Sequence, residues 1–154
     1  MPSEFDTRDV VIRRAIGTDA DVIVANSRKF NIEDGHPMSP AGISATLRLL
    51  EPDCHDGMIL VMLADGLIVG HGVLCFGYGT ELGGRDTFIE EIYIVPKMRS
   101  RGLGGVLLQK LEDAARDAGC KVMYLEVMAE NPAERLYRRM GFEGRASQLL
   151  SKLI

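Results

Sequence analysis

Apolar residues occur in two kinds of segment along this chain, one with the pattern of a strand and one with the spacing of a helix. Runs rich in β-branched and other apolar residues predict strands at about 10–15, 57–64, 67–76, 87–95 and 121–127. Apolar residues at helical spacing predict helices at about 18–30, 40–50, 103–118 and 133–140. The tail, residues 145–154, is compatible with a last strand. The predicted element order is therefore β-α-α-β-β-β-α-β-α-β.

Local signals mark the ends of several of these segments. Asp65-Gly66 predicts a tight hairpin turn, and Ser39-Pro40 predicts the N-cap and first turn of a helix. Thr18, with Asp21 three residues later, resembles a capping box that would open the first helix. Two segments are predicted to be loops, 31–38 and 77–85.

The order of elements predicts the fold class. Hairpins in the first half and a β-α-β-α unit in the second predict an α/β (α+β) fold, with a mixed central sheet of six to seven strands and helices on both faces. A length of 154 residues predicts one domain, 1–154.

Composition narrows the function classes. The net charge of −4 argues against non-specific nucleic-acid binding, and no apolar run approaches the roughly 20 residues of a membrane span. The polar, acidic start Met1–Asp6 is not typical of a signal or transit peptide, which favours the cytoplasm. The three cysteines and three histidines show no metal-ligand spacing, so we expect no metal site.

The main chemical signal is a loop between a strand and a helix. The run that begins Glu90-Glu91 ends at Pro96, and the basic, glycine-containing segment 99–105 leads directly into a helix. Free backbone N–H groups before a helix N-terminus are suited to a phosphate or diphosphate. A Walker A loop is excluded because Val106 stands where lysine is required.

A dinucleotide-binding loop is a weaker alternative. Leu107 occupies the position of its third glycine, and the strands before the loop look antiparallel. Glu126, about twenty residues on, is the one feature in favour of a nicotinamide-dependent oxidoreductase.

Several motifs together resemble the GNAT N-acetyltransferase superfamily. Residues 99–104 match its Arg-x-x-Gly-x-Gly loop, and 90–94 match its acid-acid-apolar-aromatic strand, most closely in the polyamine acetyltransferase branch. Ala133, Tyr137 and Gly141-Phe142 keep the spacing of its later helix, whereas Asn131 stands one residue late.

The resemblance implies direct transfer of an acetyl group from acetyl-coenzyme A to a small-molecule or peptide amine. Tyr137 would be the general acid that protonates the leaving thiolate, and Glu90 or Glu91 the base. Strand alternation is expected to send these two carboxylates to opposite faces, and analogy with the polyamine branch favours Glu90. The expected cofactor contacts are the main chain of Ile92, Tyr93 and Ile94, the loop Arg99, Ser100, Arg101, Gly102, Leu103, Gly104 and Gly105, and Asn131.

The sequence says less about the acyl acceptor and about the oligomeric state. The segments 31–38 and 77–85 are the expected walls of the acceptor site, where Glu33, Asp34 and Glu81 would suit a cationic amine. A non-catalytic acyl-coenzyme A binding module on the same scaffold is the main alternative, supported by the shifted Asn131. The apolar tail 149–154 is compatible with a homodimer and equally with an internal strand.

Overall fold

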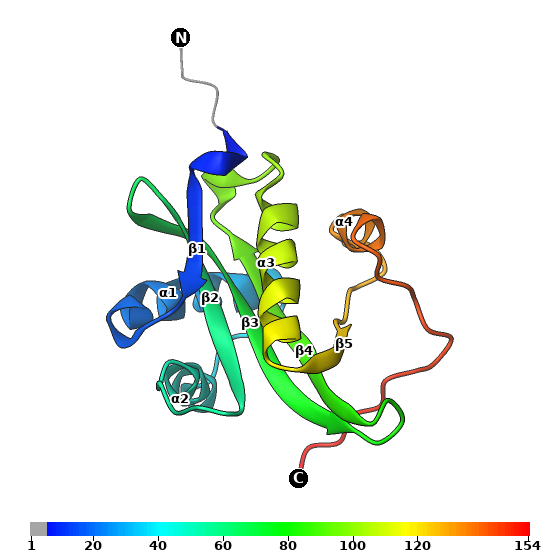
Figure 1. Cartoon of the computed structure of the whole chain (residues 1–154). Helices are drawn as coiled ribbons and strands as arrows, with labels where there is room; N and C mark the ends of the chain where they lie inside the picture. The colour runs from blue at the N-terminus through cyan, green and yellow to red at the C-terminus, as the bar shows by residue number, and fades with distance from the viewer. Residues whose placement is uncertain (1–5) are drawn as a thin grey trace.

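The computed structural model describes residues 6–154, so most of the N-terminal segment used above to argue against a leader peptide, residues 1–5, lies outside the described residues. Five strands form one sheet in the order β1-β2-β3-β4-β5 (Figure 1). The first four are antiparallel neighbours, and β5 is parallel to β4. Their bounds are β1 Val10–Arg14, β2 Gly57–Ala64, β3 Leu67–Gly79, β4 Gly84–Ile94 and β5 Cys120–Tyr124.

Four α-helices cover the two faces of this sheet. Helices α1 (Ala20–Glu33) and α2 (Pro40–Leu49) lie on one face, and α3 (Leu103–Asp117) and α4 (Glu134–Arg139) on the other (Figure 1). Each face has its own apolar cluster, one centred on Ile23 and Val61 and the other on Leu107 and Leu111. The predicted mixed sheet with helices on both faces is therefore confirmed.

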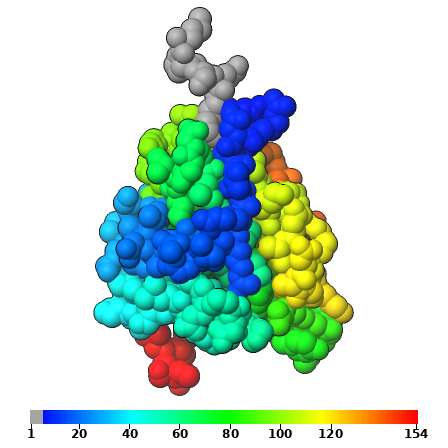
Figure 2. All heavy atoms as spheres, turned by 60° about the vertical axis from the view of Figure 1, so that its left-hand side comes forward, coloured from blue at the N-terminus to red at the C-terminus, as the bar shows by residue number. Residues whose placement is uncertain are grey.

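The predicted number of strands, six to seven, is wrong. The sheet has five strands, and no strand follows Tyr124 in the described chain. A strand requires a neighbour for its backbone hydrogen bonds, and the tail 145–154 instead faces solvent, with Leu149, Leu150 and Leu153 all exposed. The C-terminal end protrudes from the body of the molecule in Figure 2.

One predicted helix start and two predicted loops need correction. A 3-10 turn, Gly17–Asp19, precedes α1, so Thr18 lies within this turn and is not the N-cap of α1. Helix α1 also continues to Glu33, which places Asn31 and Glu33 on the helix. The predicted loop 77–85 is mostly strand, because β3 and β4 stay paired up to Gly79 and Gly84, leaving a turn of 80–83.

Other local predictions are confirmed. Asp65 and Gly66 both have positive φ (49° and 75°), as a hairpin turn of the predicted type requires. The Ser39 hydroxyl accepts a 3.0 Å hydrogen bond from the Gly42 N–H at the start of α2. Helix α3 ends just before Gly119, whose φ is 81°.

Gly70 in β3 allows the end of β4 to approach closely. A Cβ atom at this position would lie 2.7 Å from the Tyr93 carbonyl oxygen and 2.7 Å from Ile94 Cδ1. We expect Gly70→Ala to lower the free energy of unfolding by about 1–3 kcal/mol, because a buried strand would have to shift. Denaturant unfolding measures this loss. Gly17→Ala is the control, since its Cβ would meet no atom within 4 Å, and an equal loss there would contradict the explanation.

Candidate functional site

One cavity contains most of the residues expected to bind a cofactor. Its volume is about 770 Å³, and it lies where the C-terminal ends of α1 and β4, the loop before α3, and α4 meet. Its lining residues from the expected set are Ile92, Tyr93, Ile94, Arg99, Ser100, Gly102, Leu103, Gly104, Gly105, Asn131 and Tyr137. Glu90, Glu91 and Arg101 do not line it.

The loop before α3 has the backbone shape of an anion site. Ser100 and Gly102 both have positive φ (61° and 78°), and helix α3 begins directly after them at Leu103. Left-handed residues alternating with ordinary ones direct successive N–H groups into a concavity, and the helix N-terminus adds a partial positive charge. Leu103 is 2% exposed, so its burial in the core holds the start of the helix in place.

The two arginines of the loop have different contacts. Arg99 Nε donates a 2.8 Å hydrogen bond to the Ile94 carbonyl, and its Nη2 donates to both Glu33 carboxylate oxygens at 2.9 and 3.1 Å. Its guanidinium carbon lies 5.4 Å from the centroid of the Tyr93 ring. Arg101 lies outside the cavity, and its Nη2 donates to the Lys97 carbonyl at 3.3 Å. Of these two arginines, only Arg99 lines the cavity, together with Arg139 of α4.

Strands β4 and β5 separate at the cavity. Their pairing ends at Phe88 and Tyr124, whereas β4 continues for six more residues to Ile94. Along this stretch no strand of the described chain pairs with the β5 side of β4, although β3 remains paired on the other side. Backbone groups of Ile92 to Ile94 can therefore bond to a ligand that lies between the strands.

Tyr137 lies on α4, in the opposite wall of the cavity. Its ring packs edge-on against Phe142, with the ring centroids 6.1 Å apart. Burial raises the pKa of the Tyr137 hydroxyl above its ordinary value, so this group keeps its proton at neutral pH. A protonated phenol at the rim of the cavity is suited to act as a general acid.

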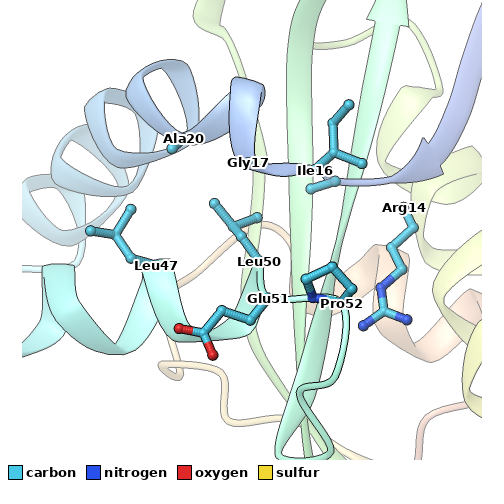
Figure 3. A pocket seen from close by; sticks show the side chains of 9 residues that line it. Arg14, Ile16, Gly17, Ala20, Leu47, Leu50, Glu51 and Pro52 are labelled. Carbon is cyan, nitrogen blue, oxygen red and sulfur yellow. The ribbon is translucent and has the colours of Figure 1, made fainter.

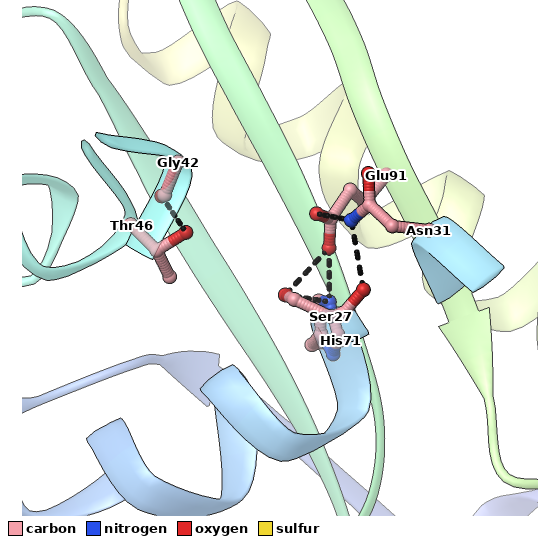
Figure 4. A network of polar contacts seen from close by, with 6 residues as sticks. All are labelled: Ser27, Asn31, Gly42, Thr46, His71 and Glu91. Atoms are coloured by element: carbon pink, nitrogen blue, oxygen red, sulfur yellow. Dashed lines mark hydrogen bonds and ion pairs between the residues drawn. The ribbon is translucent and has the colours of Figure 1, made fainter. Parts of the chain in front are cut away.

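Glu91 is held by donors from two structural elements, α1 and β3, as Figure 4 shows. Its Oε2 accepts 2.8 Å from Ser27 Oγ on α1 and 2.7 Å from His71 Nε2 on β3, and the Asn31 amide lies 3.5 Å from Oε1. Ser27 and His71 are fully buried and the Glu91 side chain is 13% exposed. Because a carboxylate can only accept, His71 must carry its proton on Nε2.

The prediction that Glu90 and Glu91 point to opposite faces is wrong. The β3–β4 register shifts between Val73, which pairs with Glu91, and Leu74, which pairs with Ile89, so Glu90 is the extra residue of a β-bulge. A bulge resets the alternation of side chains: Ile89 and Ile92, on either side of the two acids, both pack in the α3-side cluster, so Glu90 faces the α1 side as Glu91 does.

Glu90 differs from its neighbour in its surroundings. No hydrogen bond ties its carboxylate, whereas both oxygens of Glu91 lie within 3.5 Å of donors in the described chain. Partial burial, together with the charges of Glu91 and Glu126, raises the pKa of Glu90 above its ordinary value. Of the two acids, Glu90 is the better suited to accept a proton.

Among the acids predicted for the acceptor site and Asn131, all but one line the cavity. Glu33 and Asp34 line the cavity, but Glu81 lies in the 80–83 turn and does not. Asn131 lines it too, while its Oδ1 accepts a 2.9 Å hydrogen bond from the Ala133 N–H just before α4. The side-chain oxygen of the shifted asparagine therefore has a structural role.

Sequence reasoning missed several contributors. Phe30 and Leu136 line the cavity, but nothing distinguishes them from ordinary core residues in the sequence. His71 could have been recognised as a candidate, because it is a polar residue in the apolar run of β3. It pairs with Tyr93 of β4 in the sheet register. That register follows only once the bulge is known.

A second cavity of about 580 Å³ lies between the end of β1, α1 and α2 (Figure 3). Ala15, Leu47 and Leu50 form much of its apolar wall, with Arg14 and Glu51 at its edge. It contains none of the residues expected to bind a cofactor or to react. The functional site is therefore assigned to the larger cavity.

The described residues, 6–154, offer neither a membrane span nor a metal site. Within this range no helix has the length and apolar character needed to cross a membrane. Across the same residues, no group of three or more His, Cys, Asp or Glu side chains has the arrangement of a metal site.

Comparisons with known proteins agree with this geometry. The model of the acetyltransferase (GNAT) family matches residues 28–142. Thialysine N-epsilon-acetyltransferase from Bos taurus is 36% identical over 75 residues, which are 48% of this chain and 44% of that protein. This chain spans about half the length of the curated relatives it matches.

Solved structures extend the likeness to nearly the whole chain. An integron cassette protein from the mobile metagenome of Cole Harbour Salt Marsh is 29% identical, with a TM-score of 0.80 over 96% of this chain and 91% of the other. The aminoglycoside N-acetyltransferase AAC(6')-Iy, solved in complex with CoA, shares the fold at 19% identity, with a TM-score of 0.78 over 99% and 98% of the two chains.

Proposed function

Because this chain belongs to the GNAT acetyltransferase family, we propose that it transfers the acetyl group of acetyl-coenzyme A directly to an amine. One observation carries the proposal: a single cavity joins the loop before α3, the unpaired end of β4 and the Tyr137 side chain. The residues proposed for three steps line this cavity. These steps are binding of the diphosphate, activation of the carbonyl and protonation of the thiolate.

The loop would hold the diphosphate of coenzyme A. The left-handed Ser100 and Gly102 turn the amides of 100–105 inward, and the α3 N-terminus favours negative charge there. AAC(6')-Iy, which has the same fold, was solved with CoA, and this supports the same class of cosubstrate for the present chain.

The chemistry then runs across the cavity. The amine nitrogen attacks the thioester carbonyl carbon, and the negative charge that develops on the oxygen is stabilised by main-chain N–H groups of Ile92 to Ile94. Glu90 accepts the proton of the ammonium through water, because it lies outside the cavity lining. The C–S bond breaks, Tyr137 gives its proton to the departing thiolate, and the second proton lost by the attacking nitrogen restores the Tyr137 hydroxyl.

The acceptor is proposed to be a small-molecule or peptide amine. The bovine relative is named for acetylation of the ε-amine of thialysine, which supports an alkyl amine here. A cytoplasmic location and a homodimer stay predictions.

The proposed base predicts a pH dependence. Only ionised Glu90 can accept a proton, and its pKa lies above the ordinary value. We therefore expect kcat/KM to fall as the pH is lowered through that raised pKa, in addition to the effect of protonating the amine itself. A pH–rate profile of Glu90→Gln should lack this acidic limb and show about 10²- to 10⁴-fold lower activity. An unchanged limb would assign the titration to another group.

The direct test of the proposed function is an assay of coenzyme A release. Purified protein with acetyl-coenzyme A and a panel of alkyl amines and amino-terminal peptides should release thiol in proportion to acetylated product. Calorimetry on the same preparation measures cosubstrate binding. Binding without release across the panel would support the alternative, a non-catalytic acyl-coenzyme A binding module.

A further inference from the structure

An ion pair joins two residues of the cavity wall, Glu33 and Arg99. Glu33 is the last residue of α1, on the side where the acceptor is proposed to enter, and Arg99 comes from the loop proposed to hold the diphosphate. Arg99 Nη2 contacts both Glu33 oxygens, at 2.9 and 3.1 Å. The cation expected to serve the cosubstrate is therefore bound to a carboxylate on the acceptor side.

We propose that Arg99 exchanges partners during binding: the diphosphate takes over its Nη2, and the released Glu33 carboxylate binds a second positive charge of the acceptor. The proposal rests on the proposed function, because it requires coenzyme A in this cavity. It makes Glu33 a specificity-determining residue that becomes available only after the cosubstrate has bound.

The contacts of Arg99 make this exchange feasible. Its side chain is 41% exposed and that of Glu33 is 48% exposed, and ion pairs with such exposure contribute little to stability. The bond from Arg99 Nε to the Ile94 carbonyl and the Tyr93 ring beside the guanidinium can keep the head group beside the loop. A diphosphate offers several oxygens to the planar guanidinium fork, which favours it over one carboxylate.

The released carboxylate determines which acceptors gain affinity. Glu33 would lose its positive partner in the cosubstrate complex, and a partly exposed carboxylate in a cavity wall favours a cationic ligand. Acceptors with a positive group besides the reacting amine therefore gain from the exchange. A monoamine of the same length does not.

Matched variants test the exchange by calorimetry with acetyl-coenzyme A. Glu33→Gln removes the competing carboxylate, so we expect about two- to fivefold tighter binding than in Asp34→Asn. Asp34 is the control because it is the next residue in the same cavity wall, and its substitution removes the same charge without removing the partner of Arg99. Equal dissociation constants in the two variants would overturn the proposal.

The acceptor half uses 1,4-diaminobutane and n-pentylamine as probes in the presence and absence of coenzyme A. In the wild-type protein the diamine should bind more tightly once coenzyme A is present, and Glu33→Gln should weaken this binding at least about tenfold. Diamine binding that is absent, or independent of coenzyme A, would overturn the exchange while leaving the proposed function intact. A folded wild-type protein that does not bind acetyl-coenzyme A would instead refute the proposed function itself.

Discussion

Tyr137→Phe is expected to lower kcat by about 10²- to 10⁴-fold, the usual contribution of a general acid. The substitution removes only the hydroxyl, and the ring keeps its packing against Phe142. The thiolate would then leave without a proton from the protein, while the contacts proposed for the diphosphate are untouched. Steady-state kinetics gives the change in kcat, and calorimetry should give an unchanged dissociation constant for acetyl-coenzyme A.

The neighbouring residue Phe142 provides a control for Tyr137→Phe. Phe142 contacts the same ring without lining the cavity, so Phe142→Leu should alter packing but retain most of kcat. Turnover by Tyr137→Phe at the wild-type rate would remove Tyr137 from the mechanism. Comparable losses of kcat in both variants would indicate that packing of the ring matters more than its hydroxyl.

The second large effect is expected on stability, from Glu91→Ala. This change removes the acceptor shared by the buried His71 and Ser27 donors, whose Nε2 and Oγ atoms lie 3.4 Å apart. A buried donor left without its acceptor typically costs about 1–3 kcal/mol, and since the Glu91 side chain is only 13% exposed we expect a loss of about 2–3 kcal/mol in the free energy of unfolding. Denaturant melts of the purified variants measure it.

Glu90 is the matched control for Glu91, since it is the same residue type one position earlier. Glu90→Ala should change the free energy of unfolding by no more than about 0.5 kcal/mol, while greatly reducing turnover. Glu91→Gln retains an acceptor oxygen for His71 and should lose less stability than Glu91→Ala. If Glu90→Ala proved the more destabilising of the two alanine variants, the roles assigned to these acids would have to be reversed.

Local signals predicted much of this fold because they depend on neighbours in sequence. The Asp65-Gly66 turn sets the β2–β3 hairpin, and the apolar stripe of α3, which includes Leu107 and Leu111, is evident without knowing what it packs against. The loop 99–105 was recognisable for the same reason. Its glycines and its position between a strand and a helix define its backbone shape.

The features that sequence reasoning missed depend on contacts between distant segments. The bulge at Glu90 follows from the register of β3 against β4, and it places both acids on the α1 side. The Glu91 network joins α1, β3 and β4, so no local pattern shows it. The tail illustrates the opposite error, because apolar residues such as Leu149 and Leu150 are compatible with a strand although no strand among residues 6–154 pairs with them.

The central claim is that main-chain amides from Ser100 to Gly105 bind the diphosphate of acetyl-coenzyme A. Backbone amide NMR of the folded protein tests it most directly, with acetyl-coenzyme A compared with S-acetylpantetheine, which lacks the diphosphate. The account predicts large shifts of the 100–105 amides with acetyl-coenzyme A and small ones with S-acetylpantetheine. Unperturbed amides in this loop at saturating acetyl-coenzyme A would contradict it.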